Sequence, residues 1–197
     1  MKLYKFMSLE KFERVEMILL NKRFHLSKWS ELNDPMEGYF YHIIYNTDLP
    51  YKNQIYNFLS DKSELKICSF SATYSPIMLW WNYANEYKGI AIEINVNKKD
   101  YLNLFKVRYI KNIPTLDFLN NPKLTDAFTN KIKFWSYEKE YRIIEKVESI
   151  AIGSITGIYY GIKMKLFDKS RIKKLLDDSV KTYETQIDFD SNKIIIK

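Results

Sequence analysis

Two hydrophobic periodicities alternate irregularly along the chain, and this irregular order limits the folds that the chain can adopt. Residues 65–71 and 139–145 alternate as half-buried strands do, whereas residues 9–19 and 123–133 are predicted to be helical. Helices and strands follow one another without a repeat and without the regular strand–helix–strand order of a doubly wound sheet. The sequence therefore predicts an α+β fold.

The chain is long enough for one domain with a hydrophobic core and short for two. It has 197 residues, of which 46% are hydrophobic, and glycine and proline occur only five times each, which excludes collagen-like and linker-rich architectures. We therefore expect a single domain over residues 1–197. Six apolar side chains of the predicted elements are expected in its core: Phe12, Ile18, Leu19, Ile92, Ile143 and Leu175.

The chain contains no long apolar stretch that could span a membrane and few cysteines and histidines that could bind a metal. No stretch approaches the roughly 18 consecutive apolar residues of a membrane span, and residues 1–4 do not resemble the start of a signal peptide. We expect a cytoplasmic protein without a membrane partner. Cys68 is the only cysteine and His25 and His42 are the only histidines, too few for a Cys/His metal cage. No metal is expected, although binding by carboxylates alone stays open.

The chain is basic, with a formal net charge of +7. A basic surface is typical of proteins that bind a polyanion such as nucleic acid, because neutralised phosphates release counterions. A lysine-rich solvated surface without such a partner explains the same charge. The densest basic segment, residues 163–181, also contains Asp168, Asp177 and Asp178, so its charge is mixed.

The most informative motif is Glu138-Lys139-Glu140, which opens the predicted strand over residues 139–145. Side chains two residues apart point to the same face of a strand, so Glu138, Glu140 and Arg142 are expected on one face. Such a carboxylate pair can divide its work, one ionised and the other protonated or bonded to a substrate. The alternative is a solvated strand face whose charges form ion pairs.

Three further segments offer polar or aromatic groups. Ser69 and Ser71 lie on one face of a predicted strand, where their hydroxyls either bond a ribose or carboxylate or are simply small polar residues. Trp80 and Tyr83 belong to a run of aromatic residues that suits either stacking on a planar ring or core packing. Residues 33–37 form an Asn-Asp-Pro turn or an ordered loop at the mouth of a site.

The chain resembles a family of uncharacterised bacterial proteins, domain of unknown function number twenty-nine seventy-one. The matching motifs run in order along nearly the whole chain: L-Y-K-F at 3–6, L-N-D-P-M-E at 32–37, C-S-F-S at 68–71, M-L-W-W-N-Y-A at 78–84, K-G-I-A-I-E at 88–93 and W-S-Y-E-K-E-Y-R at 135–142. This family name implies no activity.

The layout is also similar, more loosely, to the ADP-ribosyltransferase superfamily. That resemblance implies a split antiparallel β-sandwich with flanking helices that binds NAD. It places Tyr4 or Lys5 on the first NAD-binding strand, although Arg or His is typical there, and Ser69 and Ser71 on the second. It makes Glu140 the catalytic carboxylate, with Glu138 assisting the acceptor. Further NAD contacts are expected from Trp80, Tyr83 and Arg142.

The resemblance implies an enzyme for which NAD is a substrate. It would transfer ADP-ribose to a protein or nucleic-acid acceptor, or hydrolyse the nicotinamide bond, as a bacterial toxin or phage-defence effector does. One alternative is a nonenzymatic module of a defence system that binds nucleic acid or another partner. Another is a metal-dependent nuclease in which Asp34, together with Glu64 and Lys66 or with Glu138 and Glu140, supports Mg²⁺ chemistry. Sequence motifs of classical hydrolases and of phosphate-binding loops are not found.

Overall fold

The computed structural model has the mixed α+β character that the sequence predicts, and it describes residues 1–43 and 49–197. The chain divides into two units, each assembled from separated segments. The first unit consists of Met1–Phe24, Ser69–Leu102 and Ser149–Lys197, and the second of His25–Cys68 and Asn103–Glu148. The expectation of one domain over residues 1–197 stays a prediction.

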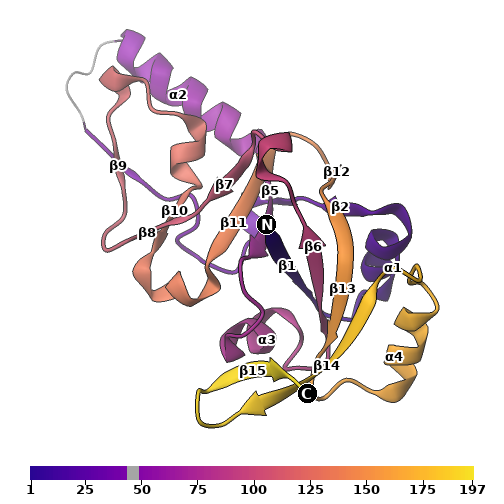
Figure 1. Ribbon diagram of the computed structural model, residues 1–197. Coiled ribbons are helices and arrows are strands. Elements are labelled where there is room, and N and C mark those ends of the chain that lie inside the picture. The colour runs from indigo at the N-terminus through magenta and orange to yellow at the C-terminus, as the bar shows by residue number, and fades with distance from the viewer. Residues whose placement is uncertain (44–48) are drawn as a thin grey trace. The chain divides into compact units, whose positions relative to one another are not determined.

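The sheet of the first unit is built around β6 (Ile90–Asn95), whose first five residues are all buried. β1 and β13 flank β6 and are antiparallel to it, β14 is parallel to β13, and β15 forms a hairpin with β14 (Figure 1). Their bounds are β1 (Lys2–Met7), β13 (Ser154–Tyr160), β14 (Lys181–Asp188) and β15 (Lys193–Ile196). The apolar run of β6 is explained by its central place, because both faces of this strand are covered.

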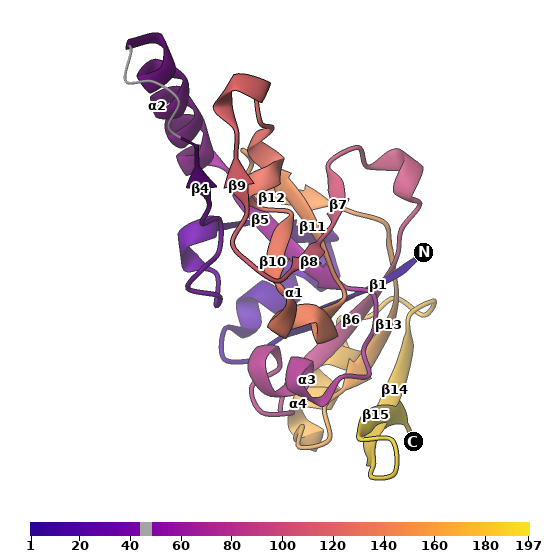
Figure 2. The ribbon, with the colours of Figure 1, turned by 90° about the vertical axis from the view of Figure 1, so that its left-hand side faces the viewer.

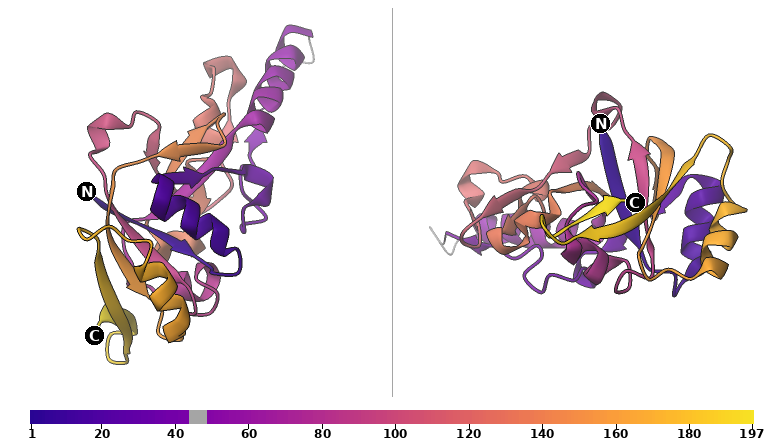
Figure 3. Two further views of the ribbon diagram at one scale, coloured as in Figure 1. Left: turned by 90° about the vertical axis from the view of Figure 1, so that its right-hand side faces the viewer. Right: turned by 60° about the horizontal axis from the view of Figure 1, so that its bottom comes forward.

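Helices cover both faces of this sheet. Successive strand residues point to opposite faces, so the contacts of Tyr159 and Tyr160 distinguish the two. Tyr159 contacts the ring of Tyr74, just before α3 (Ile77–Tyr83), whereas Tyr160 lies 5.7 Å from the ammonium of Lys169 in α4 (Leu166–Lys173). α1 (Phe12–Asn21) lies beside α4 (Figure 3). The remaining short elements of this unit are β2 (Arg23–His25), which reaches the unit boundary, β12 (Ser149–Ala151) and a 3-10 helix at Lys98–Asp100.

The second unit combines one long helix, α2 (Leu49–Glu64), with short paired strands (Figure 2). β11 is antiparallel to β7, β10 is parallel to β8, and β4 is parallel to β9. The strands are β3 (Ser27–Lys28), β4 (Tyr41–His42), β7 (Leu104–Lys106), β8 (Arg108–Ile110), β9 (Thr115–Leu116), β10 (Asn130–Ile132) and β11 (Glu140–Glu145). The 3-10 helices are η1 (Trp29–Glu31), η3 (Phe118–Asn120), η4 (Leu124–Ala127) and η5 (Lys133–Glu138). β5 (Lys66–Ser71) begins in this unit, where it pairs with β3, and ends in the first.

An aromatic core holds the second unit together. Phe118 contacts the ring of Phe58 at 5.1 Å and that of Tyr51 at 6.5 Å, so η3 is packed on α2. The buried members of this core are Tyr51, Phe58, Leu65, Ile67, Leu116, Phe118, Ala127, Phe128 and Ile144. Ile144 belongs to β11, so the same strand that carries Glu140 is anchored in this core.

Most of the expected core residues are buried, and the exceptions have local causes. Ile18, Leu19, Ile92 and Ile143 are buried. Phe12 and Leu175 are only half-buried. Phe12 begins α1 and is covered by the guanidinium of Arg171, whereas Leu175 lies beyond the end of α4.

The helix expected over residues 123–133 is wrong. This segment forms the short 3-10 helix η4 and then β10, because pairing with β8 overrides the local helical pattern. Within the described residues, no helix combines the length and the apolar character that a membrane span requires.

Candidate functional site

Glu138 and Glu140 lie at the junction of η5 and β11, in the second unit, and both are buried. Lys139 between them has a left-handed backbone with a φ of 45°, which turns the chain from the 3-10 helix into the strand. The side chain of Lys139 is exposed. The turn therefore leaves the two carboxylates in the interior and the intervening lysine in solvent.

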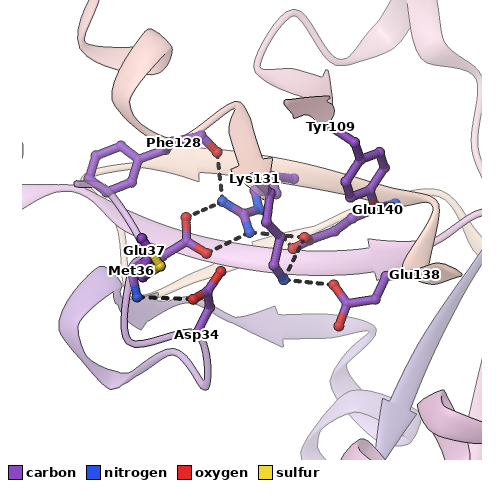
Figure 4. A network of polar contacts seen from close by, with 9 residues as sticks. Asp34, Met36, Glu37, Tyr109, Phe128, Lys131, Glu138 and Glu140 are labelled. Carbon is purple, nitrogen blue, oxygen red and sulfur yellow. Dashed lines mark hydrogen bonds and ion pairs between the residues drawn. The ribbon is translucent and has the colours of Figure 1, made fainter. Parts of the chain in front are cut away.

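Both carboxylates bind one ammonium group. Lys131 Nζ lies 2.7 Å from Glu138 Oε2 and 3.2 Å from Glu140 Oε2 (Figure 4). Lys131 is itself buried on β10, and the ring of Trp135 in η5 lies 4.8 Å from its ammonium. The expectation that Glu138 and Glu140 share a strand face is wrong, because Glu138 ends η5 and β11 begins only at Glu140, yet both carboxylates reach this common partner.

Arg142 is the most deeply buried charge of this site, with 1% of its surface exposed. Its Nε donates to Glu140 Oε1 at 2.7 Å, and Nη2 donates to Glu140 Oε2 at 2.9 Å and to Glu37 Oε2 at 2.8 Å. Its Nη1 donates to Glu37 Oε1 at 2.5 Å and to the carbonyl of Phe128 at 2.6 Å. All five N–H donors of the guanidinium are therefore used inside the protein.

Glu37 comes from the loop that the sequence marked as a turn. Asp34 accepts from the backbone N–H of Met36 at 2.9 Å, and its carbonyl accepts from the N–H of Glu37 at 3.0 Å, which closes the turn. Gly38 follows with a φ of 70°, and a Cβ on it would lie 2.7 Å from the ring of Phe128. Asp34 thus makes the expected turn, and the turn delivers Glu37 to Arg142. That this loop borders the mouth of a site stays a prediction.

Lys62 of α2 extends this set of charges beyond Glu37. Its ammonium lies 3.9 Å from the ring of Trp29, with Phe40 and Phe128 near it as well. Burial lowers the pKa of Lys62, and the charge of Glu37 opposes that shift. Cations and carboxylates therefore alternate in the order Lys62, Glu37, Arg142, Glu140, Lys131 and Glu138, and each is less than 8% exposed. We call these six residues the charge ladder.

The electrostatics keep the centre of the ladder ionised. Burial lowers the pKa of Arg142, but the charges of Glu140 and Glu37 outweigh burial and raise it above its usual value. Tyr109 accepts a hydrogen bond from the backbone N–H of Glu140 at 2.8 Å, and burial raises the pKa of its phenol. The expectation of a solvated charged face is wrong, because these charges are buried, but the ion pairs that it included are present.

A small, partly enclosed hollow opens beside the ladder. Its polar lining comes from Asp34, Glu37, Asn130 and Lys131, and apolar side chains such as Ile110 and Ile132 complete it. Glu37 and Lys131 therefore belong both to the ladder and to the wall of the hollow. The sequence singled out residues 33–37 but gave no sign that Glu37 pairs with Arg142, and it did not single out Lys131.

The expected NAD-binding residues of the early strands lie in the first unit. Tyr4 is buried, and its phenol donates to Glu93 Oε2 at 3.2 Å, whereas the ammonium of Lys5 donates to the carbonyl of Ser69 at 3.0 Å. The hydroxyl of Ser71 donates to the carbonyl of Thr73 at 2.8 Å and so closes a turn after β5. Their roles toward NAD stay predictions.

Trp80 and Tyr83 lie on α3 of the first unit. Trp80 is fully buried, its indole N–H donates to the carbonyl of Tyr74 at 2.6 Å, and its ring packs on Phe6 at 5.2 Å. Stacking of Trp80 on a ligand stays a prediction that would require the core of this unit to open. Tyr83 is half-buried.

Glu93 is a buried carboxylate that sequence reasoning did not select. It lies on β6 and accepts from Thr156 at 2.7 Å and from Tyr159 at 2.9 Å, besides its contacts with Tyr4 and Lys2. Burial raises the pKa of Glu93, but these hydrogen bonds outweigh burial and lower it. Burial and the charge of Glu93 raise the pKa of Tyr4 to about 12. A lone glutamate in the apolar run Ile90–Ile94 is the signal that could have found this cluster.

Within residues 1–43 and 49–197, no three His, Cys, Asp or Glu side chains form a group that could hold a metal ion. Glu64 pairs instead with Lys146 at 2.5 Å.

Comparison with known proteins gives no match: no family model, no curated protein and no solved structure matches this chain. The resemblance to domain of unknown function number twenty-nine seventy-one and to the ADP-ribosyltransferase superfamily therefore stays a prediction. The function has to be argued from the residues of the chain itself.

Replacing Arg142 by methionine tests whether the charge ladder supports the second unit. Arg142→Met leaves Glu37 and Glu140 buried without their shared cation, so we expect a loss of about 3–5 kcal/mol in the free energy of unfolding. The measurement is denaturant unfolding followed by tryptophan fluorescence. Arg108→Met is the matched control, because Arg108 is exposed and faces Asp126 at 3.6 Å, and it should lose less than about 1 kcal/mol. Equally small losses in both variants would contradict the ladder's structural role.

Glu93 predicts a specific dependence of stability on pH. Its pKa is lower in the folded protein than the 4.5 of an unperturbed glutamate, so its contribution is complete above pH 4.5 and is lost as the pH falls. The free energy of unfolding should therefore fall more steeply below about pH 5 in the wild type than in Glu93→Gln. Glu86→Gln, at a glutamate of the same unit whose side chain is 47% exposed, serves as control and should retain the wild-type slope. Identical slopes for all three proteins would refute this assignment.

Proposed function

We propose that the protein is an NAD-dependent enzyme that breaks the bond between nicotinamide and ribose and passes ADP-ribose to an acceptor or to water. One observation carries the proposal: Glu138 and Glu140 converge on the ammonium of Lys131 at 2.7 and 3.2 Å. Two carboxylates at one reaction centre are the groups that most glycoside-cleaving enzymes use.

The fixed position of Glu140 suits the charge that develops in this reaction. As the nicotinamide leaves, the ribose carbon gains positive charge, and a carboxylate oriented in advance stabilises that charge without reorganising. Arg142 holds both oxygens of Glu140 through two hydrogen bonds, at 2.7 and 2.9 Å. Orientation of the carboxylate is thus established when the protein folds rather than when the substrate binds.

The charges around Glu140 balance within the ladder. Its three carboxylates, Glu37, Glu138 and Glu140, meet three cations, Lys62, Lys131 and Arg142. The nicotinamide ring of NAD is positively charged until it leaves. In this proposal Glu140 stabilises the ribosyl cation, and Glu138 accepts the proton of the attacking hydroxyl, side chain or water.

Aromatic side chains beside the carboxylates supply surfaces for planar rings. Trp135 and Tyr137 of η5 are half-buried with their rings 6.1 Å apart, and Phe134 is 76% exposed. These rings lie within six residues of Glu140 along the chain and suit stacking on a nicotinamide or an adenine. An ADP-ribosyltransferase-like split sandwich, with Tyr4, Lys5, Ser69 and Ser71 as NAD contacts, remains part of this proposal by resemblance. Glu138, Glu140 and Lys131, whose contacts support this proposal, all lie in the second unit.

Nicotinamide release measured by chromatography, together with calorimetric titration of NAD, tests this proposal. We expect the wild type to bind NAD and release nicotinamide, and Glu140→Gln to bind NAD but release nicotinamide at least about 100-fold more slowly. Glu145→Gln, on the same strand but outside the charge ladder, should retain the wild-type rate.

A second variant separates chemistry from folding. If Glu140→Gln does not fold, Glu138→Gln replaces it, with NAD binding retained and the rate of release lowered. A wild-type protein that neither binds NAD nor releases nicotinamide refutes the proposal, as does a folded Glu140→Gln variant with full activity.

A further inference from the structure

A second surface, in the first unit, concentrates much of the chain's positive charge. Residues 163–174 contain six lysines and arginines and one acid, Asp168, in a chain whose net charge is +7. Five of these basic residues are exposed, and the sixth, Lys169, is half-buried and pairs with Glu184 at 2.7 Å. Lys165, Lys173 and Lys174 form no ion pair with a carboxylate in the part of the chain that the structure describes. Their charges are therefore available to a partner.

The loop before α4 brings one of these lysines beside an exposed tryptophan. The backbone N–H of Lys163 donates to the carbonyl of Tyr87 at 3.0 Å, which joins the loop to the segment after α3. The ammonium of Lys163 then lies 6.0 Å from the ring of Trp81 and 5.5 Å from that of Tyr87. Trp81 is 47% exposed.

A matching pair of ring and cation lies on α4. Phe167 is 71% exposed, and the guanidinium of Arg171 lies 5.8 Å from its ring. The same guanidinium stacks at 3.6 Å on the ring of Phe12, the first residue of α1, which fixes it in place. Exposed cations therefore flank an exposed ring along α4 and the residues beside it. We call Lys165, Phe167, Arg171, Lys173 and Lys174 the basic aromatic surface.

We propose that the basic aromatic surface binds single-stranded nucleic acid. Single strands are held by lysines and arginines on the phosphates and by aromatic rings on the unpaired bases, and this surface presents both groups side by side. A helix that lies on a membrane needs a continuous exposed apolar face. In α4 the exposed apolar side chains are confined to Leu166 and Phe167 of the first turn, and Ile172 is buried. The inference does not depend on the proposed NAD chemistry.

Fluorescence anisotropy of a labelled single-stranded oligothymidine of twenty nucleotides, titrated at several salt concentrations, tests the proposal. The triple variant Lys165→Ala, Lys173→Ala and Lys174→Ala should bind at least about tenfold more weakly and with a shallower salt dependence, because phosphate contacts are lost. Phe167→Ala should bind at least about fivefold more weakly with the salt dependence unchanged, because a stacking contact is lost.

The matched control also removes three positive charges, but from the second unit. Lys52, Lys106 and Lys111 are exposed lysines of the second unit, and their triple alanine variant should change the affinity less than about twofold. Equal weakening in both triple variants would overturn the proposal in favour of diffuse electrostatic attraction. Wild-type affinity in both Phe167→Ala and the first triple variant would also overturn it. So would binding to vesicles of phosphatidylglycerol and phosphatidylcholine without binding to the oligonucleotide.

Discussion

The buried guanidinium of Arg142 is the constraint on which the second unit depends. An arginine removed from water has to find acceptors for five N–H groups, and here they come from a loop carboxylate, a strand carboxylate and one carbonyl. These hydrogen bonds hold the loop of Glu37 against β11 and orient the carboxylate of Glu140. Glu140 in turn binds the ammonium of Lys131, which also binds Glu138. The geometry of the candidate site thus follows from the hydrogen-bond demand of one side chain.

The first unit solves a similar problem with hydroxyl groups. Glu93 lies in the most buried strand of its sheet, and two tyrosines, a threonine and Lys2 donate to it. A carboxylate surrounded by donors stays ionised and holds the neighbouring strands in register. The surroundings of the two carboxylates differ. The donors around Glu93 complete a structural cluster, whereas two members of the charge ladder, Glu37 and Lys131, line a hollow. The proposed chemistry is placed at Glu140 because Lys131 joins it to a second carboxylate, Glu138.

Local sequence patterns predicted most helices and strands and which side chains share a strand face. They failed where a residue pairs with another that is distant in the sequence. The period of two over residues 139–145 correctly placed Glu140 and Arg142 on one face. Glu37 is 105 residues from Arg142, and no periodicity records such a pairing. Lys131 was hidden by the wrong helix over residues 123–133, since only pairing with β8 makes that segment a strand. Glu93 could have been found, because an acid in a buried apolar run needs donors.

A double-mutant cycle between Glu37 and Arg142 tests the central claim most directly, because it isolates the coupling between the loop and β11 from the cost of each substitution. The free energy of unfolding would be measured for the wild type, Glu37→Gln, Arg142→Met and the double variant. If the guanidinium joins the two elements, the double variant loses at least about 2 kcal/mol less than the two single losses combined. Losses that add within about 0.5 kcal/mol would contradict the account, since the two residues would then act independently.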